Sequence, residues 1–189
     1  MNTIRERFFL DAEQSVLLVI DVQERLCKAM DKQVLSQLTA NTGILLESAQ
    51  ELGIPVLITE QYVKGLGETL PELRAKGADA PCFEKMSFSC CGSREFVEKL
   101  RATGRRQIVI TGMETHVCVL QSALELLDAG YSVHLVRDAL MSRSKANWTT
   151  AQGITQQAGG VLTCTEAVLF QWMKVAGTES FKKLSKLVR

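Results

Sequence analysis

The sequence has little net charge and no long run of one sign. Its 189 residues carry a formal net charge of +1, and 23% of them are charged. Proteins that bind nucleic acid or an anionic membrane surface through charge need clustered basic residues. We therefore expect no nucleic acid and no membrane among the partners of this protein, which leaves a small molecule.

Long hydrophobic stretches are also missing. The apolar run at residues 16–20 is among the longest, and it is far shorter than the roughly 20 residues that a membrane-spanning helix needs. Residues 1–7 include three charged side chains and do not form the apolar core of a secretory signal. We therefore expect a cytoplasmic protein.

Cysteines in metal-binding or redox spacing are absent as well. The sequence contains no CxxC motif and no zinc-finger pattern. Its six cysteines are Cys27, Cys82, Cys90, Cys91, Cys118 and Cys164. Free thiols are the expected state in a chain of this kind. The neighbours Cys90 and Cys91 leave a redox role open, although two ordinary thiols near a helix start are the favoured interpretation.

The sequence does contain a regular alternation of strand-length apolar segments and segments of helical period. Strands are predicted at 15–21, 54–59, 107–112, 131–136 and 161–163. Helices are predicted at 34–52, 93–102, 117–129, 146–158 and 182–188, and residues 62–70 are predicted to form a loop. This order predicts right-handed βαβ units and a mainly parallel sheet covered on both faces. Because no linker interrupts the pattern, residues 1–189 are predicted to form one domain.

Two chemically capable side chains follow predicted strands. Asp21 ends the first strand, and Cys118 opens the helix after the third. Ligands of parallel sheets bind at the carboxyl ends of the strands, so both residues are expected at the same rim. Asp21 is a candidate general base, and a helix N-cap is an equally good interpretation.

Cys118 and Lys85 complete a possible reactive group. A thiol at a helix N-terminus meets the positive end of the dipole and free N–H groups, which favour a thiolate and an oxyanion. The alternative for Cys118 is an inert core thiol. Lys85 lies in an apolar stretch and would supply a positive charge beside the thiol, whereas a solvated surface lysine is the alternative.

Three segments in this order resemble the isochorismatase-like cysteine hydrolase superfamily. They are VIDVQ at 19–23, FEK at 83–85 and GMETHVCV at 112–119. That superfamily includes nicotinamidase and N-carbamoylsarcosine amidohydrolase. LITEQYVKGLG at 57–67 and VRDA at 136–139 resemble the isochorismatase domain-containing subgroup more closely. The resemblance implies a Rossmann-like three-layer α/β/α sandwich with six strands, and a homo-oligomer.

The resemblance also implies a catalytic triad of Asp21, Lys85 and Cys118. It implies an oxyanion hole made by the backbone N–H groups of Glu114 and Cys118, and a cis peptide bond between Met113 and Glu114. Trp148, Trp172 and residues 168–170 would then belong to a subunit interface, and simple core packing explains these residues equally well.

The implied reaction is cleavage of a C–N bond in a small amide or carbamoyl-type substrate through a thioester. Nicotinamidases hold a metal after the second strand with Asp and His, whereas this chain has EQY at 60–62, so we predict no metal and no cofactor. Loop position makes Gln23, Gln61, Tyr62 and Phe88 candidates for substrate binding. The rival functions are a non-catalytic oligomeric scaffold or binding protein and a thiol redox protein on the same fold.

Overall fold

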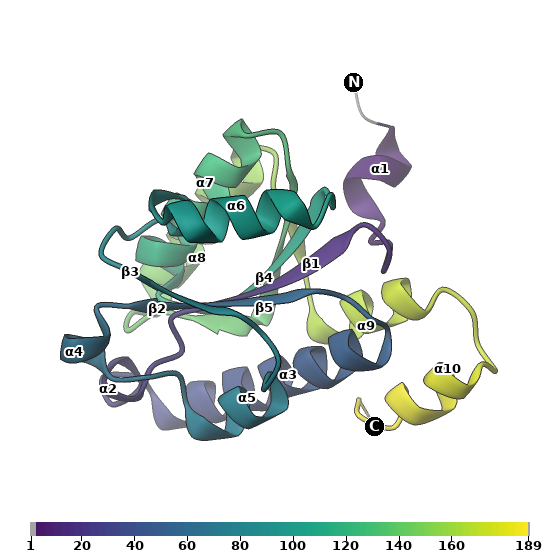
Figure 1. Ribbon diagram of the computed structural model, residues 1–189, viewed down its shortest axis with the longest axis horizontal. Coiled ribbons are helices and arrows are strands. Elements are labelled where there is room, and N and C mark those ends of the chain that lie inside the picture. The colour runs from purple at the N-terminus through teal and green to yellow at the C-terminus, as the bar shows by residue number, and fades with distance from the viewer. Residues whose placement is uncertain (1–2, 189) are drawn as a thin grey trace.

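The computed structural model describes residues 3–188 and is built on a six-stranded sheet (Figure 1). The strands are β1 (Ser15–Ile20), β2 (Val56–Gln61), β3 (Cys82–Lys85), β4 (Gln107–Met113), β5 (Ser132–Met141) and β6 (Val161–Thr163). Neighbouring strands pair in parallel in the order β3-β2-β1-β4-β5-β6. The predicted α/β architecture with a parallel sheet is confirmed.

Helices cover both faces of this sheet. They are α1 (Ile4–Phe8), α2 (Glu24–Cys27), α3 (Lys32–Glu51), α4 (Val63–Leu66), α5 (Pro71–Lys76), α6 (Arg94–Ala102), α7 (Leu120–Asp128), α8 (Lys145–Gln157), α9 (Thr165–Met173) and α10 (Glu179–Leu184). A 3₁₀ turn, η1 (Cys90–Gly92), and a π-helical turn, η2 (Thr115–Val119), precede α6 and α7. In Figure 1, α6, α7 and α8 lie on one side of the sheet, and α3, α5 and α9 lie on the other.

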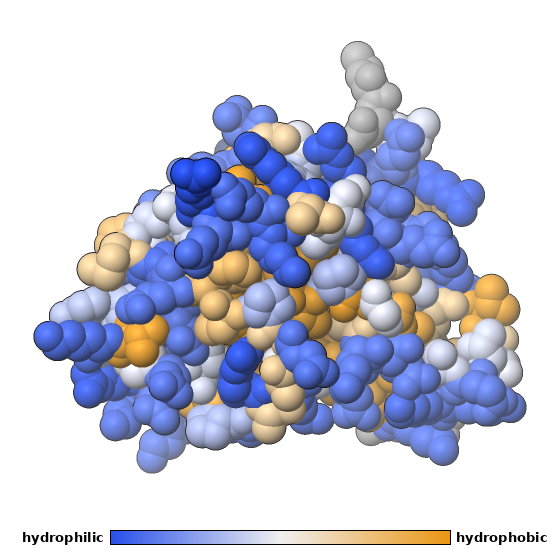
Figure 2. All heavy atoms as spheres, viewed as in Figure 1, coloured by the Kyte–Doolittle hydropathy of each residue, from blue (hydrophilic) through white to orange (hydrophobic). Residues whose placement is uncertain are grey.

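Side chains of the central strand β1 point alternately into two hydrophobic cores, one on each face of the sheet. Nearly every position of this strand is apolar for that reason. Leu17 and Val19 pack in the core under α3 and α9, and Leu18 and Ile20 pack in the core under α6 and α7. The outer surfaces of the helices are mainly hydrophilic, with apolar side chains gathered between the two layers (Figure 2). Within residues 3–188 no helix combines the length and apolarity needed to cross a bilayer.

Several predicted boundaries were wrong. The segments predicted individually did not include β3, which is a four-residue edge strand too short to show a clear period. Strand β5 continues to Met141, five residues past its predicted end. The predicted loop at 62–70 contains α4, and the last helix ends at Leu184. The tryptophan Trp172 is buried in the core, where its Nε1 donates to Ser15 Oγ at 2.9 Å.

Candidate active site

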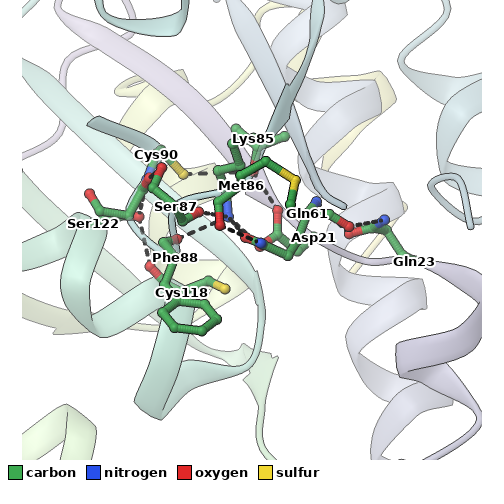
Figure 3. A network of polar contacts seen from close by, with 12 residues as sticks. Asp21, Gln23, Gln61, Lys85, Met86, Ser87, Phe88, Cys90, Cys118 and Ser122 are labelled. Carbon is green, nitrogen blue, oxygen red and sulfur yellow. Dashed lines mark hydrogen bonds and ion pairs between the residues drawn. The ribbon is translucent and has the colours of Figure 1, made fainter. Parts of the chain in front are cut away.

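The carboxyl ends of four neighbouring strands bring the predicted site residues together (Figure 3). Asp21 directly follows β1, Lys85 ends β3, and Cys118 lies in η2 just after β4. Sheet order places β1 between β2 and β4, so side chains separated by almost one hundred positions meet at one rim. The structure thus brings Asp21, Lys85 and Cys118 into one cluster.

Asp21 and Lys85 form an ion pair that is closed to solvent. Lys85 Nζ donates to Asp21 Oδ2 at 2.7 Å, and both side chains are 0% exposed. The ammonium also donates to Gln61 Oε1 and to the Phe88 carbonyl, each at 2.9 Å. Burial is the largest single influence and lowers the pKa of Lys85, but the charge of Asp21, the interactions with Cys90 and Cys118 and the hydrogen bond to Asp21 together raise this pKa above the ordinary lysine value. A solvated surface lysine is therefore the wrong interpretation of Lys85.

The backbone turns sharply at Asp21 to aim its carboxylate along the rim. Asp21 has φ of 51°, in the left-handed region that Asp enters more readily than most residues. Its Oδ1 accepts a hydrogen bond from Thr59 Oγ1 at 2.8 Å. The next helix, α2, has Gln23 as its N-cap residue, so Asp21 does not cap it.

Gly112 allows β4 to pass close to the end of β1. Its φ is 120°, and a Cβ at this position would collide with the carbonyl oxygen of Ile20. Only glycine accepts both the backbone angle and the close approach. The residue therefore helps to fix the distance between the segments that carry Asp21 and Cys118.

Cys118 is 5% exposed and faces the carboxylate. Burial raises the pKa of its thiol well above the ordinary value, and the negative charge of Asp21 raises it further, while Lys85 opposes the shift. A hydrogen bond with Asp21 contributes to the same shift. Burial and the nearby Asp21 carboxylate therefore favour the neutral thiol in the resting site, in the direction opposite to the effect expected of a helix start.

The segment before Cys118 carries the predicted oxyanion donors. The peptide bond between Met113 and Glu114 is cis. Arg143 holds the Glu114 carboxylate through its backbone N and its Nε, both 3.0 Å from Oε2. Cys118 lies in the π-helical turn η2 between Val117 and Val119, whose backbone N–H groups donate to the Glu114 carbonyl at 3.0 and 3.3 Å.

Sequence reasoning missed a second layer of polar side chains behind the carboxylate. Thr59 Oγ1 lies 3.6 Å from Cys90 Sγ, and both residues are buried. An ionised Asp21 only accepts hydrogen bonds, so the Thr59 hydroxyl donates its one hydrogen to Asp21. The same hydroxyl oxygen then accepts a hydrogen bond from the Cys90 thiol. Burial raises the pKa of Cys90 to about 12, which keeps that thiol a donor. The only signal in the sequence was the position of Thr59 at a predicted strand end.

Ser122 ties this layer to the nucleophile segment. Its Oγ accepts from the Cys90 backbone N at 2.9 Å and donates to the Cys118 carbonyl at 2.6 Å. Cys90 is thus linked to Asp21 through Thr59 and to Cys118 through Ser122.

The four predicted substrate-binding residues fall into two groups. Gln23 is buried and braces two loops: its Nε2 donates to the carbonyls of Gln61 and Gly67, and its Oε1 accepts from Gln61 N. Gln61 binds Lys85 and donates from Nε2 to the Met86 carbonyl at 2.8 Å. Both amide side chains therefore hold the backbone of the site in place, and Gln61 also holds Lys85.

Tyr62 and Phe88 instead lie at the surface, where they are 44% and 53% exposed. Their rings flank the loops that follow β2 and β3, the two strands whose ends carry Gln61 and Lys85. Of the four predicted residues, these two are therefore the ones exposed to solvent.

Three glutamates hold the loops that border the site. Glu60 accepts from Thr69 N at 2.7 Å, and Glu84 accepts from Val63 N at 2.9 Å. Glu125 accepts from Ser89 Oγ at 2.7 Å. Within residues 3–188 none of the three is in an ion pair, so their negative charges are not neutralised by a contact. In the same range no three His, Cys, Asp or Glu side chains gather to hold a metal ion.

The parallel sheet and the residues at its carboxyl edge define the isochorismatase-like hydrolase fold. The chain belongs to the isochorismatase family, whose domain model matches residues 15–167. Isochorismatase domain-containing protein 2 of Xenopus laevis is 38% identical over 189 residues, covering 100% of this chain and 90% of that protein.

Two further similar proteins carry different descriptions. The secreted isochorismatase effector Isc1 of Phytophthora sojae is 39% identical and covers 93% of this chain and 84% of its own. A structure described as MAR1 ribonuclease from Caenorhabditis elegans superposes with a TM-score of 0.89 at 33% identity, over 95% of this chain and 92% of that one.

Proposed function

We propose that this protein is a cysteine-dependent hydrolase that cleaves the C–N bond of small amides or carbamoyl compounds. The observation that carries the proposal is the Cys118 thiol facing an Asp21 carboxylate that Lys85 holds in place at 2.7 Å. Such an arrangement pairs a nucleophile with a base that is itself oriented by a third group. Membership of a hydrolase family supports the same proposal.

In the first half-reaction the neutral thiol loses its proton only as it attacks. The sulfur forms a bond to the acyl carbon while Asp21 takes the thiol proton, and the carbonyl oxygen becomes an oxyanion. The backbone N–H groups of Glu114 and Cys118 are the donors proposed to stabilise it. When the oxyanion collapses, the C–N bond breaks, and the proton on Asp21 passes to the departing nitrogen.

The second half-reaction returns the enzyme to its starting state. Asp21, again ionised, takes a proton from a water molecule that attacks the thioester carbon. The C–S bond then breaks, and the proton on Asp21 returns to the Cys118 sulfur. Burial lowers the pKa of Lys85, but the charge of Asp21 and the other contacts of the ammonium raise it by more, so Lys85 stays protonated throughout. Its role is to position the carboxylate and offset the charge around it.

Three other activities fit the site less well. Vinyl-ether cleavage of isochorismate gives no role to a cysteine. RNA cleavage, suggested by the description of the Caenorhabditis elegans relative, needs groups that bind phosphates, whereas the Lys85 ammonium in the site is buried and paired with Asp21. A redox function would need Cys90, Cys91 or Cys118 to be oxidised, and burial raises the pKa of all three thiols.

The test is a panel of small amides, carbamoyl compounds and a short RNA, assayed with wild type, Cys118→Ala and Asp21→Asn. We expect ammonia or amine release by the wild type alone and no RNA cleavage. Turnover that survives Cys118→Ala would show that Cys118 is not the nucleophile. A folded wild type that is inert throughout the panel would favour the scaffold function.

The proposal also includes a cytoplasmic location and assembly into a homo-oligomer. All six cysteines are free thiols, which suits the reducing cytoplasm, although the Phytophthora relative is named as secreted. A homo-oligomer is proposed from the family resemblance, and light scattering on the purified protein measures it directly.

A further inference from the structure

We propose that Arg143 is a positioning residue for the reaction, because it holds the Glu114 side chain and thereby fixes the Glu114 backbone N–H that is proposed to bind the oxyanion. The inference rests on the proposed function and gives a role to a residue outside the proposed triad. It depends on two observations, the unused N–H of Glu114 and the contacts that hold this part of the chain.

The backbone N–H of Glu114 has no acceptor in the folded chain. Glu114 lies between β4 and η2, and within residues 3–188 its N–H donates to no backbone carbonyl. The residue is only 6% exposed, and buried N–H groups normally have a partner. Its carbonyl, by contrast, accepts from Val117 N at 3.0 Å and from Val119 N at 3.3 Å. The free donor is therefore available to a substrate oxygen.

Arg143 holds the carboxylate of the same residue from two directions. Its backbone N donates to Glu114 Oε2 at 3.0 Å, and its Nε lies 3.0 Å from Oε2 and 3.1 Å from Oε1. The Glu114 side chain is 8% exposed, so without the guanidinium a buried negative charge would lack its counter-ion. We expect that charge to move toward water and to carry the Glu114 backbone with it.

Two further contacts attach the following residues to the same stretch of chain at the end of β5. Thr115 Oγ1 donates to the Met141 carbonyl at 2.9 Å, and both residues are buried. His116 Nδ1 lies 3.0 Å from Ser142 Oγ. Three consecutive residues after β4 thus each contact one of three consecutive residues at the end of β5. Arg143 supplies the only charge on the β5 side of these contacts.

Two reactions of the Cys118 sulfur separate this role from a general structural one. Acylation by a thioester adds the sulfur to a carbonyl carbon, places a negative charge on the carbonyl oxygen, and then expels the leaving thiolate. Alkylation by iodoacetamide forms a C–S bond at a CH₂ group as iodide leaves, and no oxyanion forms. Asp21 accepts the thiol proton in both reactions. A displaced Glu114 N–H should therefore slow acylation alone.

The experiment measures both rates on Cys118 by intact mass and peptide mapping, with a small activated thioester and with iodoacetamide. The Arg143 side chain is 62% exposed, so Arg143→Gln removes no core packing. We expect acylation to be at least about tenfold slower in Arg143→Gln, and alkylation to keep the wild-type rate. The matched control is Lys145→Gln, which removes an exposed cation that is in no ion pair within residues 3–188 and should change neither rate.

An unchanged acylation rate in Arg143→Gln, or an equal loss in both reactions, would overturn the inference and leave the proposed function intact. Wild type that is alkylated on Cys118 but never acylated there would instead remove the proposed function.

A double-mutant cycle tests whether Arg143 acts through Glu114. Glu114→Gln keeps the side-chain size and removes the charge, and this variant alone should slow acylation and not alkylation. Adding Arg143→Gln to it should slow acylation by less than about twofold more, because the contact is already weakened. The same loss from Arg143→Gln in both backgrounds would show that the arginine acts independently of Glu114, which would contradict the positioning role.

Discussion

Lys85 and Asp21 form an ion pair whose two side chains are closed to solvent. Replacing Lys85 with Met leaves the carboxylate buried without its partner, so we expect a loss of about 3–5 kcal/mol in the free energy of unfolding and loss of turnover. Urea denaturation measures the first quantity. The exposed pair of Lys182 and Glu179 is the control, because Lys182→Met should cost less than about 1 kcal/mol. Similar costs for the two variants would contradict the account of the buried pair.

The pH dependence of the same pair has a definite sign. Because the pKa of Lys85 is raised in the folded state, its contribution to stability is complete below the unfolded lysine value of about 10.4 and is lost only as the pH rises through the folded value. The stability difference between wild type and Lys85→Met should therefore stay constant from pH 7 to about pH 10 and shrink above it.

Thr59 is the residue-scale support that the carboxylate requires. Thr59→Val removes the hydroxyl that donates to Asp21 Oδ1 and keeps the side-chain shape, so we expect a loss of about 1.5–3 kcal/mol in stability and a lower kcat. Thr59→Ser retains the hydroxyl and should retain most of the activity. Equal kcat values in the two variants would show that the hydroxyl does not position the carboxylate.

At the scale of elements, strand β5 carries a histidine that resists protonation. His134 is 1% exposed with Nε2 unpaired, and burial lowers its pKa to about 4. Since the unfolded chain takes up a proton near pH 6.5 and the folded chain does not, stability should fall by about 3 kcal/mol between pH 6.5 and 4. His134→Leu should remove this part of the slope, which urea unfolding across that range measures. A variant with the same slope as wild type would contradict the assignment.

The close pairing of β4 with the end of β1 depends on Gly112. Gly112→Ala forces a side chain against the Ile20 carbonyl at a φ of 120°, so we expect a fall in melting temperature and loss of activity together. Gly153 in α8 is the matched control: its Cβ would meet nothing within 4 Å, and Gly153→Ala should stabilise by about 0.5–1 kcal/mol. Normal stability in Gly112→Ala would show that the pairing of β4 with the end of β1 tolerates a side chain at this position.

The sequence predicted elements well where hydrophobic period and length agreed, as in β1 and α3. It failed at β3, where only four residues pair at the edge, and at β5, where the chain bends and its register with β4 shifts after Ile110. In the structure Arg143 binds Glu114, and Asp138 Oδ1 accepts from Thr165 N at 2.9 Å at the start of α9. Such partners depend on how loops meet in space, which local patterns do not encode.

For the molecule as a whole, topology explains why so much of the site could be foreseen. A parallel sheet collects the carboxyl ends of its strands at one rim, so residues at strand ends in the sequence become neighbours in space. Asp21, Lys85 and Cys118 obey this rule. The charge state of the thiol could not be foreseen, because it depends on burial and on how closely the carboxylate lies to the sulfur. Those are properties of packing across strands.

Acylation of Cys118 tests the central claim most directly. Wild type, Asp21→Asn and Cys118→Ala are mixed with a small activated ester or thioester, quenched in acid after milliseconds to seconds, and analysed by intact mass and peptide mapping. We predict one acyl group on Cys118 in wild type, formed before the steady state, a much slower adduct in Asp21→Asn, and none at this position in Cys118→Ala. Acylation that proceeds at the same rate without the Asp21 carboxylate, or that falls on another cysteine, would contradict the account.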